Sequence, residues 1–133
     1  MTEYERTVGV RYQDFDTVGV ANNAMFATYA EEGRRGYLTD HLGLDLHETR
    51  VVLAHMEFDF ERPVTEMTEV SVRVRTTDVG ESSYTLAYEI GQDGDRIAVG
   101  ETVQVTVDDD GRPTPLPDDW RDALTPRVAS PQR

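Results

Sequence analysis

The fold is organised around VRYQDFDTVGVANNAMFATYAEEGRRGYL, the stretch from Val10 to Leu38. It carries the end of a strand pattern, a turn-forming segment with two aspartates and two adjacent asparagines, and the one long helical pattern of the chain. The sequence that follows consists mainly of alternating apolar and polar residues, the period-two pattern of β-strands. We therefore expect any reaction centre to lie in this stretch, where polar side chains gather between a strand and a helix.

Small and apolar residues in this stretch recur at the spacing of a helix face: Phe26, Ala30, Gly33 and Tyr37. The pattern predicts an amphipathic helix of about four turns that starts near Asn23. Asn22 or Asn23 is a suitable N-cap, and Gly43 is a suitable stop. A glycine inside a helix costs about 1 kcal/mol relative to alanine, so Gly33 and Gly36 predict a closely packed neighbouring backbone.

The strand pattern recurs in five stretches: residues 4–12, 52–60, 70–75, 84–90 and 97–107. In the second stretch the expected core face is Val52, Ala54, Met56, Phe58 and Phe60. His55, Glu57 and Asp59 then lie on the opposite face. In the last stretch a single alternation would place Glu101 among the valines, and a β-bulge near Gly100 would restore the register.

One domain accounts for the length of the chain, because 133 residues can bury a self-sufficient core. The order of strand, loop, long helix and four strands predicts an α+β fold with one antiparallel sheet wrapped around a central helix. Residues 116–120 suggest a short helix, so we place the domain at residues 1–124. We expect residues 125–133 to form a flexible C-terminal tail.

The charge balance is strongly acidic, because 26 acidic residues oppose 13 basic residues, all of them arginine. Such a surface repels phosphate backbones, so we expect no nucleic-acid partner. A large acid excess is also a property of halophilic proteins, and our hypothesis is a high-salt cytoplasm; the alternative is an ordinary acidic protein. The absence of cysteine excludes disulfides and thiolate sites.

The N-terminal residues MTEYERTVGV contain no apolar run. No window approaches the roughly 20 apolar residues of a membrane span. We therefore expect a cytoplasmic protein without a signal peptide and without a membrane partner.

The segment RYQDFDTVGVANNAMFATYAEEGR resembles the signature of the 4-hydroxybenzoyl-CoA thioesterase family, a group of hotdog-fold proteins. Members commonly show a strand that runs into D-x-D, then two residues, a glycine and a short polar stretch that opens the helix. The Arg62-Pro63 step and the ending at Pro115 to Trp120 are also similar, so the resemblance covers roughly residues 5 to 124. It implies an acyl-CoA thioesterase that releases a free acid and coenzyme A, with no cofactor besides the coenzyme A of the substrate.

The resemblance assigns the catalytic carboxylate to the second aspartate of the motif, Asp16. In related members this residue is a general base toward water or a nucleophile toward the carbonyl, and the sequence leaves both open. Backbone amides at the helix N-terminus would polarise the thioester carbonyl. The oxyanion and substrate-binding residues implied in this way are Val20, Asn22, Asn23 and Ala24.

Simpler roles exist for the same residues. By themselves, Asp14 and Asp16 fit Asx turns and the asparagines fit helix caps, and we assign Asp14 a structural role. Phe26 and Tyr29 fit the core, although their position nearest the loop makes them candidates for an acyl pocket. Glu31 fits an exposed ion pair one helical turn from an arginine; because some hotdog enzymes use a helix carboxylate, it is the reserve catalytic candidate.

Many members of the family carry a histidine in this loop. This chain has none there, and Val20 stands directly after Gly19. His41, His47 and His55 are isolated along the sequence and spaced unlike metal ligands, so we predict no metal site. The chain has no GxGxxG, P-loop or GxSxG motif. This argues against dinucleotide cofactors, nucleoside triphosphates and serine-hydrolase chemistry.

Two other functions remain open. A hotdog acyl-thioester dehydratase or hydratase normally needs a histidine paired with a carboxylate, which the loop lacks. A non-catalytic acyl-thioester binding protein is favoured by the same lack. Family members assemble with sites between subunits, so the resemblance implies a homodimer or homotetramer. A sheet covered by one helix also leaves an apolar face or edge for association.

Overall fold

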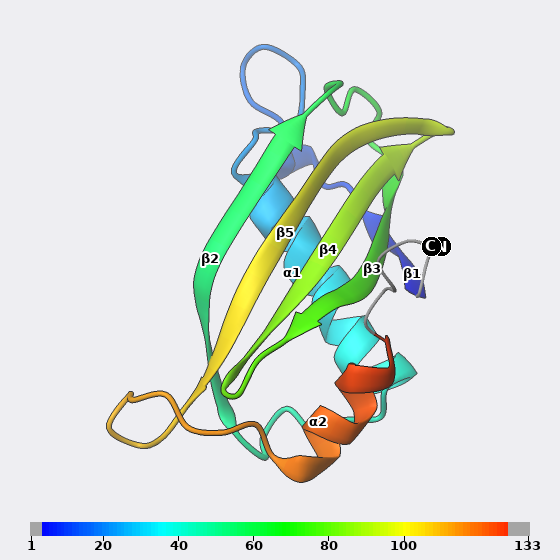
Figure 1. Ribbon diagram of the computed structural model, residues 1–133. Helices are drawn as coiled ribbons and strands as arrows, with labels where there is room; N and C mark the ends of the chain where they lie inside the picture. The colour runs from blue at the N-terminus through cyan, green and yellow to red at the C-terminus, as the bar shows by residue number, and fades with distance from the viewer. Residues whose placement is uncertain (1–3, 128–133) are drawn as a thin grey trace.

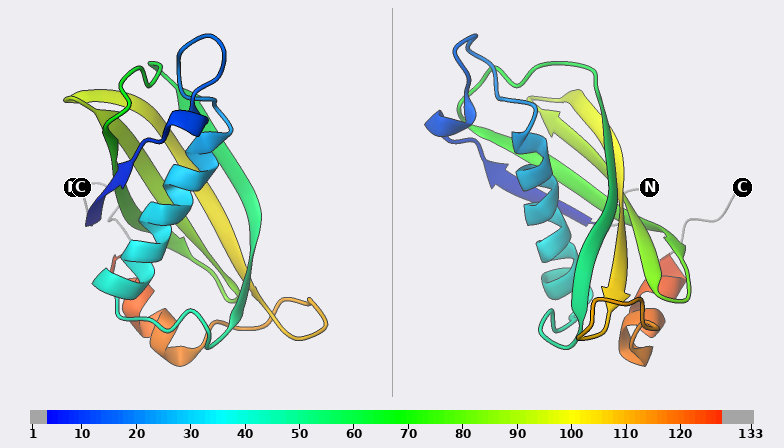
Figure 2. Two further views of the ribbon diagram at one scale, coloured as in Figure 1. Left: turned by 180° about the vertical axis from the view of Figure 1, so that it is seen from behind. Right: turned by 90° about the vertical axis from the view of Figure 1, so that its left-hand side faces the viewer.

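The computed structural model describes residues 4–127 and contains a five-stranded sheet with one long helix (Figure 1). The main elements follow in chain order: β1 (Tyr4–Gly9), α1 (Met25–Gly36), β2 (Arg50–Phe60), β3 (Glu69–Val79), β4 (Ser83–Gln92), β5 (Asp95–Val107) and α2 (Asp118–Leu124). The sheet is antiparallel with the strand order β1-β3-β4-β5-β2. Because α1 lies along one face of this sheet (Figure 2), the predicted α+β architecture is confirmed.

The packing of α1 explains the glycines inside it. Phe26, Ala30 and Tyr37 are buried, as the apolar stripe predicts. A Cβ on Gly33 would lie 2.5 Å from Val72 Cγ1 on β3, well inside van der Waals contact. Glycine therefore lets the helix lie close to β1 and β3, and α1 covers that half of the sheet.

The first turn of α1 begins later than the sequence predicts. Its first residue is Met25, not Asn23, and the N-cap position, Ala24, has no capping side chain. Asn22 forms a turn before the helix instead. Its Oδ1 accepts the Ala24 amide at 2.8 Å, and its carbonyl accepts the Met25 amide at 2.9 Å.

The other end of the long helix agrees with the prediction. A π-helical turn, Tyr37–His41, continues α1. Gly43 follows with a φ of 71°, a left-handed conformation that glycine adopts without a steric penalty. The Gly43 amide donates to the Thr39 carbonyl at 3.1 Å, and the Leu44 amide donates to the Leu38 carbonyl at 2.9 Å. These bonds satisfy carbonyls of the last turn.

The prediction that Val52 and Ala54 lie on the core face of β2 is wrong. The pairing of β2 with β5 shifts between Leu53 and His55, which makes Ala54 a bulge and reverses the alternation there. The β2 residues on the face toward α1 are Val51, Leu53, Met56, Phe58 and Phe60. Val52 therefore lies on the opposite face, the outer face of the sheet.

The predicted bulge in β5 is displaced along the strand. The register shift lies at Ile97, opposite the Ile90–Gly91 step, and not at Gly100. Beyond it a single alternation continues, so Glu101 does lie on the same face as the valines. That face is the outer one. The face toward α1 instead carries three buried polar side chains, those of Thr102, Gln104 and Thr106.

Hydrogen bonds satisfy most of the polar groups of these three side chains. The hydroxyl oxygens of Tyr88 and Thr102 are 2.6 Å apart, and Arg34 Nη1 donates to the Tyr88 hydroxyl at 3.0 Å. Gln104 Nε2 donates to the Tyr84 carbonyl at 3.1 Å. Gln104 Oε1 is the one buried side-chain oxygen or nitrogen of residues 4–127 without a partner. The core on this side is therefore held by directional contacts as well as by apolar burial.

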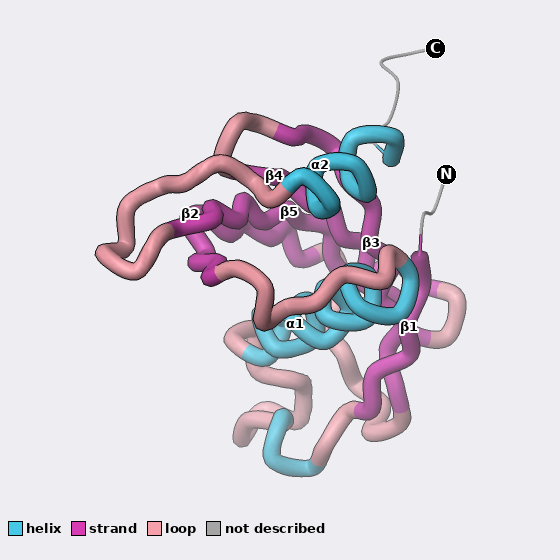
Figure 3. Tube along the Cα trace, turned by 90° about the horizontal axis from the view of Figure 1, so that it is seen from below, coloured by secondary structure: helices cyan, strands magenta, loops and turns pink. Residues whose placement is uncertain are grey.

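The short helix α2 lies at the lower end of the sheet in Figure 1, and Figure 3 shows it from below. Trp120 is fully buried, and its Nε1 donates to Glu48 Oε1 at 3.0 Å. Thr125–Arg127 add a 3₁₀ turn after α2. The rest of the expected flexible tail, residues 128–133, lies outside the described residues. Between residues 4 and 127, no helix has both the length and the hydrophobicity needed to cross a bilayer.

Candidate active site

Asp16 lies in a loop that projects past the upper end of the sheet in Figure 1 and is closed by its own backbone. A bridge pairs Phe15 with Ala21, and the Asp16 amide donates to the Val20 carbonyl at 3.0 Å. Asp16 Oδ1 accepts the Val18 amide at 2.8 Å, which is an Asx turn. The side chain is exposed, and its second oxygen has no partner within residues 4–127.

Asp14 is the buried aspartate of the motif, and it anchors the loop. Its carboxylate accepts the Arg11 amide at 2.9 Å, the Arg11 guanidinium at 2.9 and 3.1 Å, and the Tyr29 hydroxyl at 3.1 Å. Burial by itself would raise the pKa of Asp14, but these hydrogen bonds outweigh it and hold the pKa below its usual range. Burial and the contact with Asp14 raise the pKa of the Tyr29 phenol. Asp14 thus has the structural role that we assigned to it.

The junction between the loop and α1 leaves one backbone amide unbonded. The amides of Ala24 and Met25 bond to Asn22, and the Phe26 amide donates to the Asn23 carbonyl at 3.2 Å. The Asn23 amide itself has no acceptor among the described residues. It is therefore the donor at this end of α1 that a carbonyl oxygen can use, and the helix dipole favours negative charge there.

Phe26 and Tyr29, the candidates for an acyl pocket, lie in the core and are 2% and 1% exposed. Their rings meet edge to face with centroids 5.5 Å apart. Phe26 also meets Phe60 of β2 edge to face at 4.9 Å. Phe60 is 45% exposed, so it is the accessible end of an aromatic cluster that reaches from β2 to the first turn of α1.

Glu31, the reserve candidate, is exposed and forms the expected ion pair with Arg35, at 3.5 Å. Helical spacing places it on the same side of α1 as Arg34 and Leu38. Those two residues line a cavity of about 200 Å³ with Leu53 of β2. Glu31 therefore faces the open side of the molecule between α1 and β2.

The sheet edge beside this region is apolar and uncovered. Among the described strands, β2 pairs only with β5, and on the face toward α1 Leu53, Met56 and Phe60 are 47%, 42% and 45% exposed. None of the four main cavities in residues 4–127 is lined by Asp16. The described chain thus brings together the loop, the helix N-terminus and an apolar strip, but it leaves them open to solvent.

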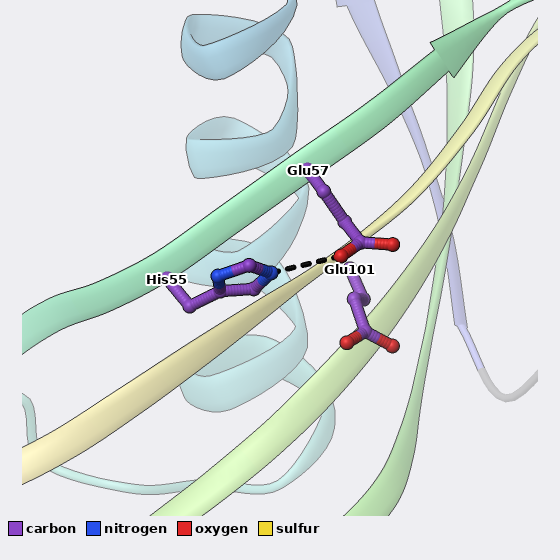
Figure 4. A group of neighbouring side chains, drawn as sticks. All are labelled: His55, Glu57 and Glu101. Carbon is purple, nitrogen blue, oxygen red and sulfur yellow. Dashed lines mark hydrogen bonds and ion pairs between the residues drawn. The ribbon is translucent and has the colours of Figure 1, made fainter.

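His55 is isolated from the other histidines along the sequence, but two carboxylates lie beside it in the fold. Its Nε2 lies 2.8 Å from Glu57 Oε1, and Glu101 of β5 completes a three-residue group on the outer face of the sheet (Figure 4). This histidine–carboxylate pair lies across the sheet from α1, so it does not supply the pair that a dehydratase needs beside Asp16. The sequence does show that His55 and Glu57 share a face of the strand, because they are two residues apart. It does not show that β5 lies next to β2, so it could not predict that Glu101 joins them.

This chain is similar to known proteins over a region that includes the D-x-D loop and α1. A sequence model of the thioesterase-like superfamily matches residues 10–124. The uncharacterized protein YsmA of Bacillus subtilis (strain 168) is 33% identical over 103 residues, which are 75% of this chain and 69% of that protein. The residues matched by the superfamily model include the D-x-D loop, α1 and the complete set of strands from β2 to β5.

Solved structures extend this similarity to the fold. A predicted thioesterase from Bacillus stearothermophilus is 31% identical with a TM-score of 0.85, and the match covers 97% of this chain and 98% of that one. A thioesterase from Thermus thermophilus, solved with coenzyme A and zinc, is 36% identical with a TM-score of 0.83 over 93% of this chain and 98% of that one. The fold is therefore the hotdog fold that the sequence resemblance implies.

Proposed function

Since this chain belongs to the thioesterase-like superfamily, we propose that it hydrolyses an acyl-CoA thioester to a free acid and coenzyme A. The observation that carries the proposal is an exposed carboxylate, Asp16, with one unbonded oxygen, in the same loop and helix junction as the unbonded Asn23 amide. The Thermus relative that was solved with coenzyme A supports a CoA thioester as the substrate.

In this mechanism the Asn23 amide donates a hydrogen bond to the thioester carbonyl oxygen, where negative charge develops. One such donor is worth about 3 kcal/mol in the transition state. As a base, Asp16 takes a proton from the attacking water, the C–S bond breaks, and the proton passes to the leaving thiolate. As a nucleophile, Asp16 attacks the carbonyl carbon and the C–S bond breaks, which gives an acyl anhydride and the thiolate of coenzyme A. Water then hydrolyses the anhydride to the free acid and regenerates Asp16, and the thiolate takes up a proton from water. A thioester is already activated, so either route needs no triad.

We propose that a second copy of the chain closes the site. β2 is an edge strand of 11 residues with no proline or lysine, and it exposes apolar side chains on the face toward α1. Such an edge promotes aggregation unless it is paired or covered. Antiparallel pairing of β2 with the same strand of a second copy would extend the sheet and bury Leu53 and Met56. A homodimer satisfies this requirement, and a homotetramer would be built from two such dimers.

The substrate groups can be assigned to parts of this open side. We place the acyl group along Met56 and Phe60, with Phe26 behind them, because these β2 side chains are exposed and the Phe60 ring contacts Phe26 in the first turn of α1, which follows the loop. For the phosphates of coenzyme A we propose Arg62. It is exposed in the segment that follows β2, and this segment contacts the loop through the bond from the Ala21 amide to the Val64 carbonyl, 3.0 Å. Other arginines, such as those of β3, lie on the outer face.

The test compares Asp16→Asn with a matched control, Asp45→Asn. Asp45 is also exposed, and its Oδ1 accepts the His47 amide at 2.9 Å, so the control removes the negative charge of a carboxylate in a similar Asx turn elsewhere. We expect Asp16→Asn to lower kcat/KM for acyl-CoA by at least about 100-fold and the control to lower it less than about twofold. Thiol release from a panel of acyl-CoAs, followed with a thiol-reactive dye, measures both.

The same assay separates the alternatives. Equal activity in Asp16→Asn and wild type would remove Asp16 from the mechanism, and Glu31→Gln would be tested next. Binding of acyl-CoA by calorimetry without any thiol release would identify a non-catalytic binding protein, which the openness of the Asp16 loop in the described chain favours as the second candidate. Hydration of an enoyl-CoA without thiol release would identify a hydratase.

A further inference from the structure

His55, Glu57 and Glu101 form a compact group on the outer face of the sheet, away from the Asp16 loop. His55 and Glu57 are same-face neighbours on β2, and Glu57 pairs directly with Glu101 on β5. One nitrogen or oxygen from each of the three side chains lies within 4.8 Å of the others (Figure 4). Two of these atoms, His55 Nε2 and Glu57 Oε1, are already 2.8 Å apart.

We propose that these three side chains bind a divalent transition-metal ion. Imidazole nitrogen with two carboxylate oxygens suits ions such as Zn²⁺, Ni²⁺ or Mn²⁺, whereas Mg²⁺ prefers an all-oxygen site. Metal–ligand distances of about 2.0–2.2 Å place neighbouring ligand atoms about 3.0–3.5 Å apart. Small rotations of exposed side chains reach that spacing from the arrangement in the structure, and water fills the remaining positions.

A second observation, the charge pairing of the strands, also points to a cation. Glu57 and Glu101 are direct cross-strand partners, and like charges at such positions destabilise a sheet. In residues 4–127 no arginine forms an ion pair with either carboxylate. Of the arginines that line the same groove, Arg96 pairs with Glu61, and Arg73 pairs with Glu5 and Glu89. Arg75 lies in the same cross-strand row, but Ala87 of β4 separates it from Glu101. Within ion-pair distance, the two carboxylates therefore have no basic partner among the described residues other than His55.

The backbone below the group is well fixed. Glu57 and Glu101 belong to adjacent paired strands, and the next pair, Phe58 and Gly100, is so close that a Cβ on Gly100 would clash with the Phe58 ring and the Glu57 carbonyl. The carboxylates also line an open groove of about 440 Å³, so an ion can reach them from solvent. A bound ion would cross-link the edge strand β2 to β5.

Metal binding also changes the hydrogen bond between His55 and Glu57. A ring nitrogen that binds a metal ion carries no proton, so the ion would take the place of a proton between Nε2 and Glu57 Oε1. In the metal-bound state the neutral ring carries its one proton on Nδ1. The inference does not depend on the proposed thioesterase activity, because the group lies across the sheet from α1.

The experiment is calorimetric titration of the full chain with Zn²⁺, Ni²⁺ and Mg²⁺, after treatment with a chelator and in buffers with about 0.15 and about 1 M KCl. The molar salt screens diffuse attraction of cations to the acidic surface but spares direct coordination. We expect one Zn²⁺ per chain at both salt concentrations, weaker binding of Mg²⁺, and a rise in Tm on addition of Zn²⁺. We expect Glu101→Gln and His55→Asn each to weaken Zn²⁺ binding by at least about 10-fold.

His47→Asn is the matched control, because His47 is an exposed histidine outside the group. It should leave Zn²⁺ binding unchanged. The proposal is overturned if wild type binds no Zn²⁺ in molar KCl, or if binding survives unchanged in both Glu101→Gln and His55→Asn. His55 and Glu57 are exposed and Glu101 is half-buried, so we expect the variants to fold, and circular dichroism of each variant checks this. An anomalous diffraction peak at the group in a crystal soaked with Zn²⁺ would give the ligand set directly.

Discussion

The two halves of the sheet differ in what covers them. On the half formed by β1 and β3, α1 packs so closely that its interior glycines are required. Most of β3 and all of β4, the strand beside it, bury every second residue. On the half formed by β5 and β2, the inner face of β5 is polar, and β2 exposes apolar residues on its inner face. Within residues 4–127, the edge strand β1 spans 6 residues and the edge strand β2 spans 11.

This difference indicates a division of tasks. The covered half holds the hydrophobic contacts that make the chain a stable domain. The open half holds the surface on which a second copy and a substrate would be placed. Changes in the open half should therefore affect assembly and turnover, whereas changes in the covered half should affect the free energy of unfolding.

The largest effect is expected from a charge in the middle of the open edge. Met56→Glu would bury two uncompensated carboxylates across paired β2 strands, so we expect the dissociation constant of the dimer to rise by at least about 1,000-fold, or about 4 kcal/mol. Sedimentation at micromolar concentration measures it, and thioesterase activity should fall in parallel. The control is Thr7→Glu on the exposed face of β1. A wild-type chain that is strictly monomeric at this concentration would contradict the arrangement.

In the covered half, the corner where β1 ends depends on Asp14. Asp14→Asn removes a buried charge that Arg11 and Tyr29 bind, and we expect the free energy of unfolding at pH 7 to fall by about 2–3 kcal/mol. Urea denaturation measures the loss, with Asp45→Asn as the control. A loss below about 0.5 kcal/mol would show that Arg11 and Tyr29 find other partners.

The same variant has a defined pH dependence. The pKa of Asp14 is lower in the folded chain than its usual value near 4, so its stabilisation is complete above that value and is lost as the pH falls through the folded pKa. The difference between wild type and Asp14→Asn should therefore be constant from pH 7 down to about 5 and shrink below about 4. A difference that grows on acidification would contradict this sign.

A smaller effect is expected where α1 meets β3. In Gly33→Ala the added methyl group collides with Val72, and we expect a loss of about 1–2 kcal/mol despite the better helix propensity of alanine. The double variant with Val72→Ala should lose less than the sum of the two single variants. Additive losses in urea denaturation would mean that the two residues are not in tight contact.

The smallest effect concerns the surface charge of both halves. The chain carries a formal net charge of −13. If it belongs to a high-salt cytoplasm, molar KCl should screen this repulsion and raise Tm by a few degrees relative to dilute buffer. Equal melting temperatures in the two buffers would favour an ordinary acidic protein.

The covered half could be predicted from the sequence because its structure follows local patterns, namely helix periodicity and the residues that end helices and form turns. The stripe from Phe26 to Tyr37 predicted the helix face, and Gly43 predicted its end. Gly33 predicted a tightly packed neighbour, and the atoms that it meets belong to the side chains of Val72 and Val74 on β3 and not to a backbone as expected. The Asp93-Gly94 hairpin between β4 and β5 also follows from turn chemistry, since both residues have positive φ values. The motif around Asp16 indicated the family.

The open half could not be predicted in the same way, because it depends on contacts between distant strands. No turn-forming residue marks the bulge at Ala54. The alternation of the sequence therefore predicted Val52 on the core face, where the structure has Leu53. A strand usually buries its apolar face, but β5 buries its polar face. Hydrogen bonds to Tyr88 and Tyr84 of β4 compensate for this burial, and the sequence does not show them. Glu101 joins His55 through the strand order alone.

The bulge at Ala54 also bears on how the edge strand tolerates sequence variation. Leu53 and His55 pair with Gln104 and Val103, which are adjacent on β5, so deletion of Ala54 would make the ladder regular and leave the other β2 residues on their present partners and faces. Leu53 would keep its place in the wall of the 200 Å³ cavity. Because a bulge adds a local bend and twist, a single-codon deletion could therefore straighten the exposed edge without recontouring that cavity or altering the D-x-D loop.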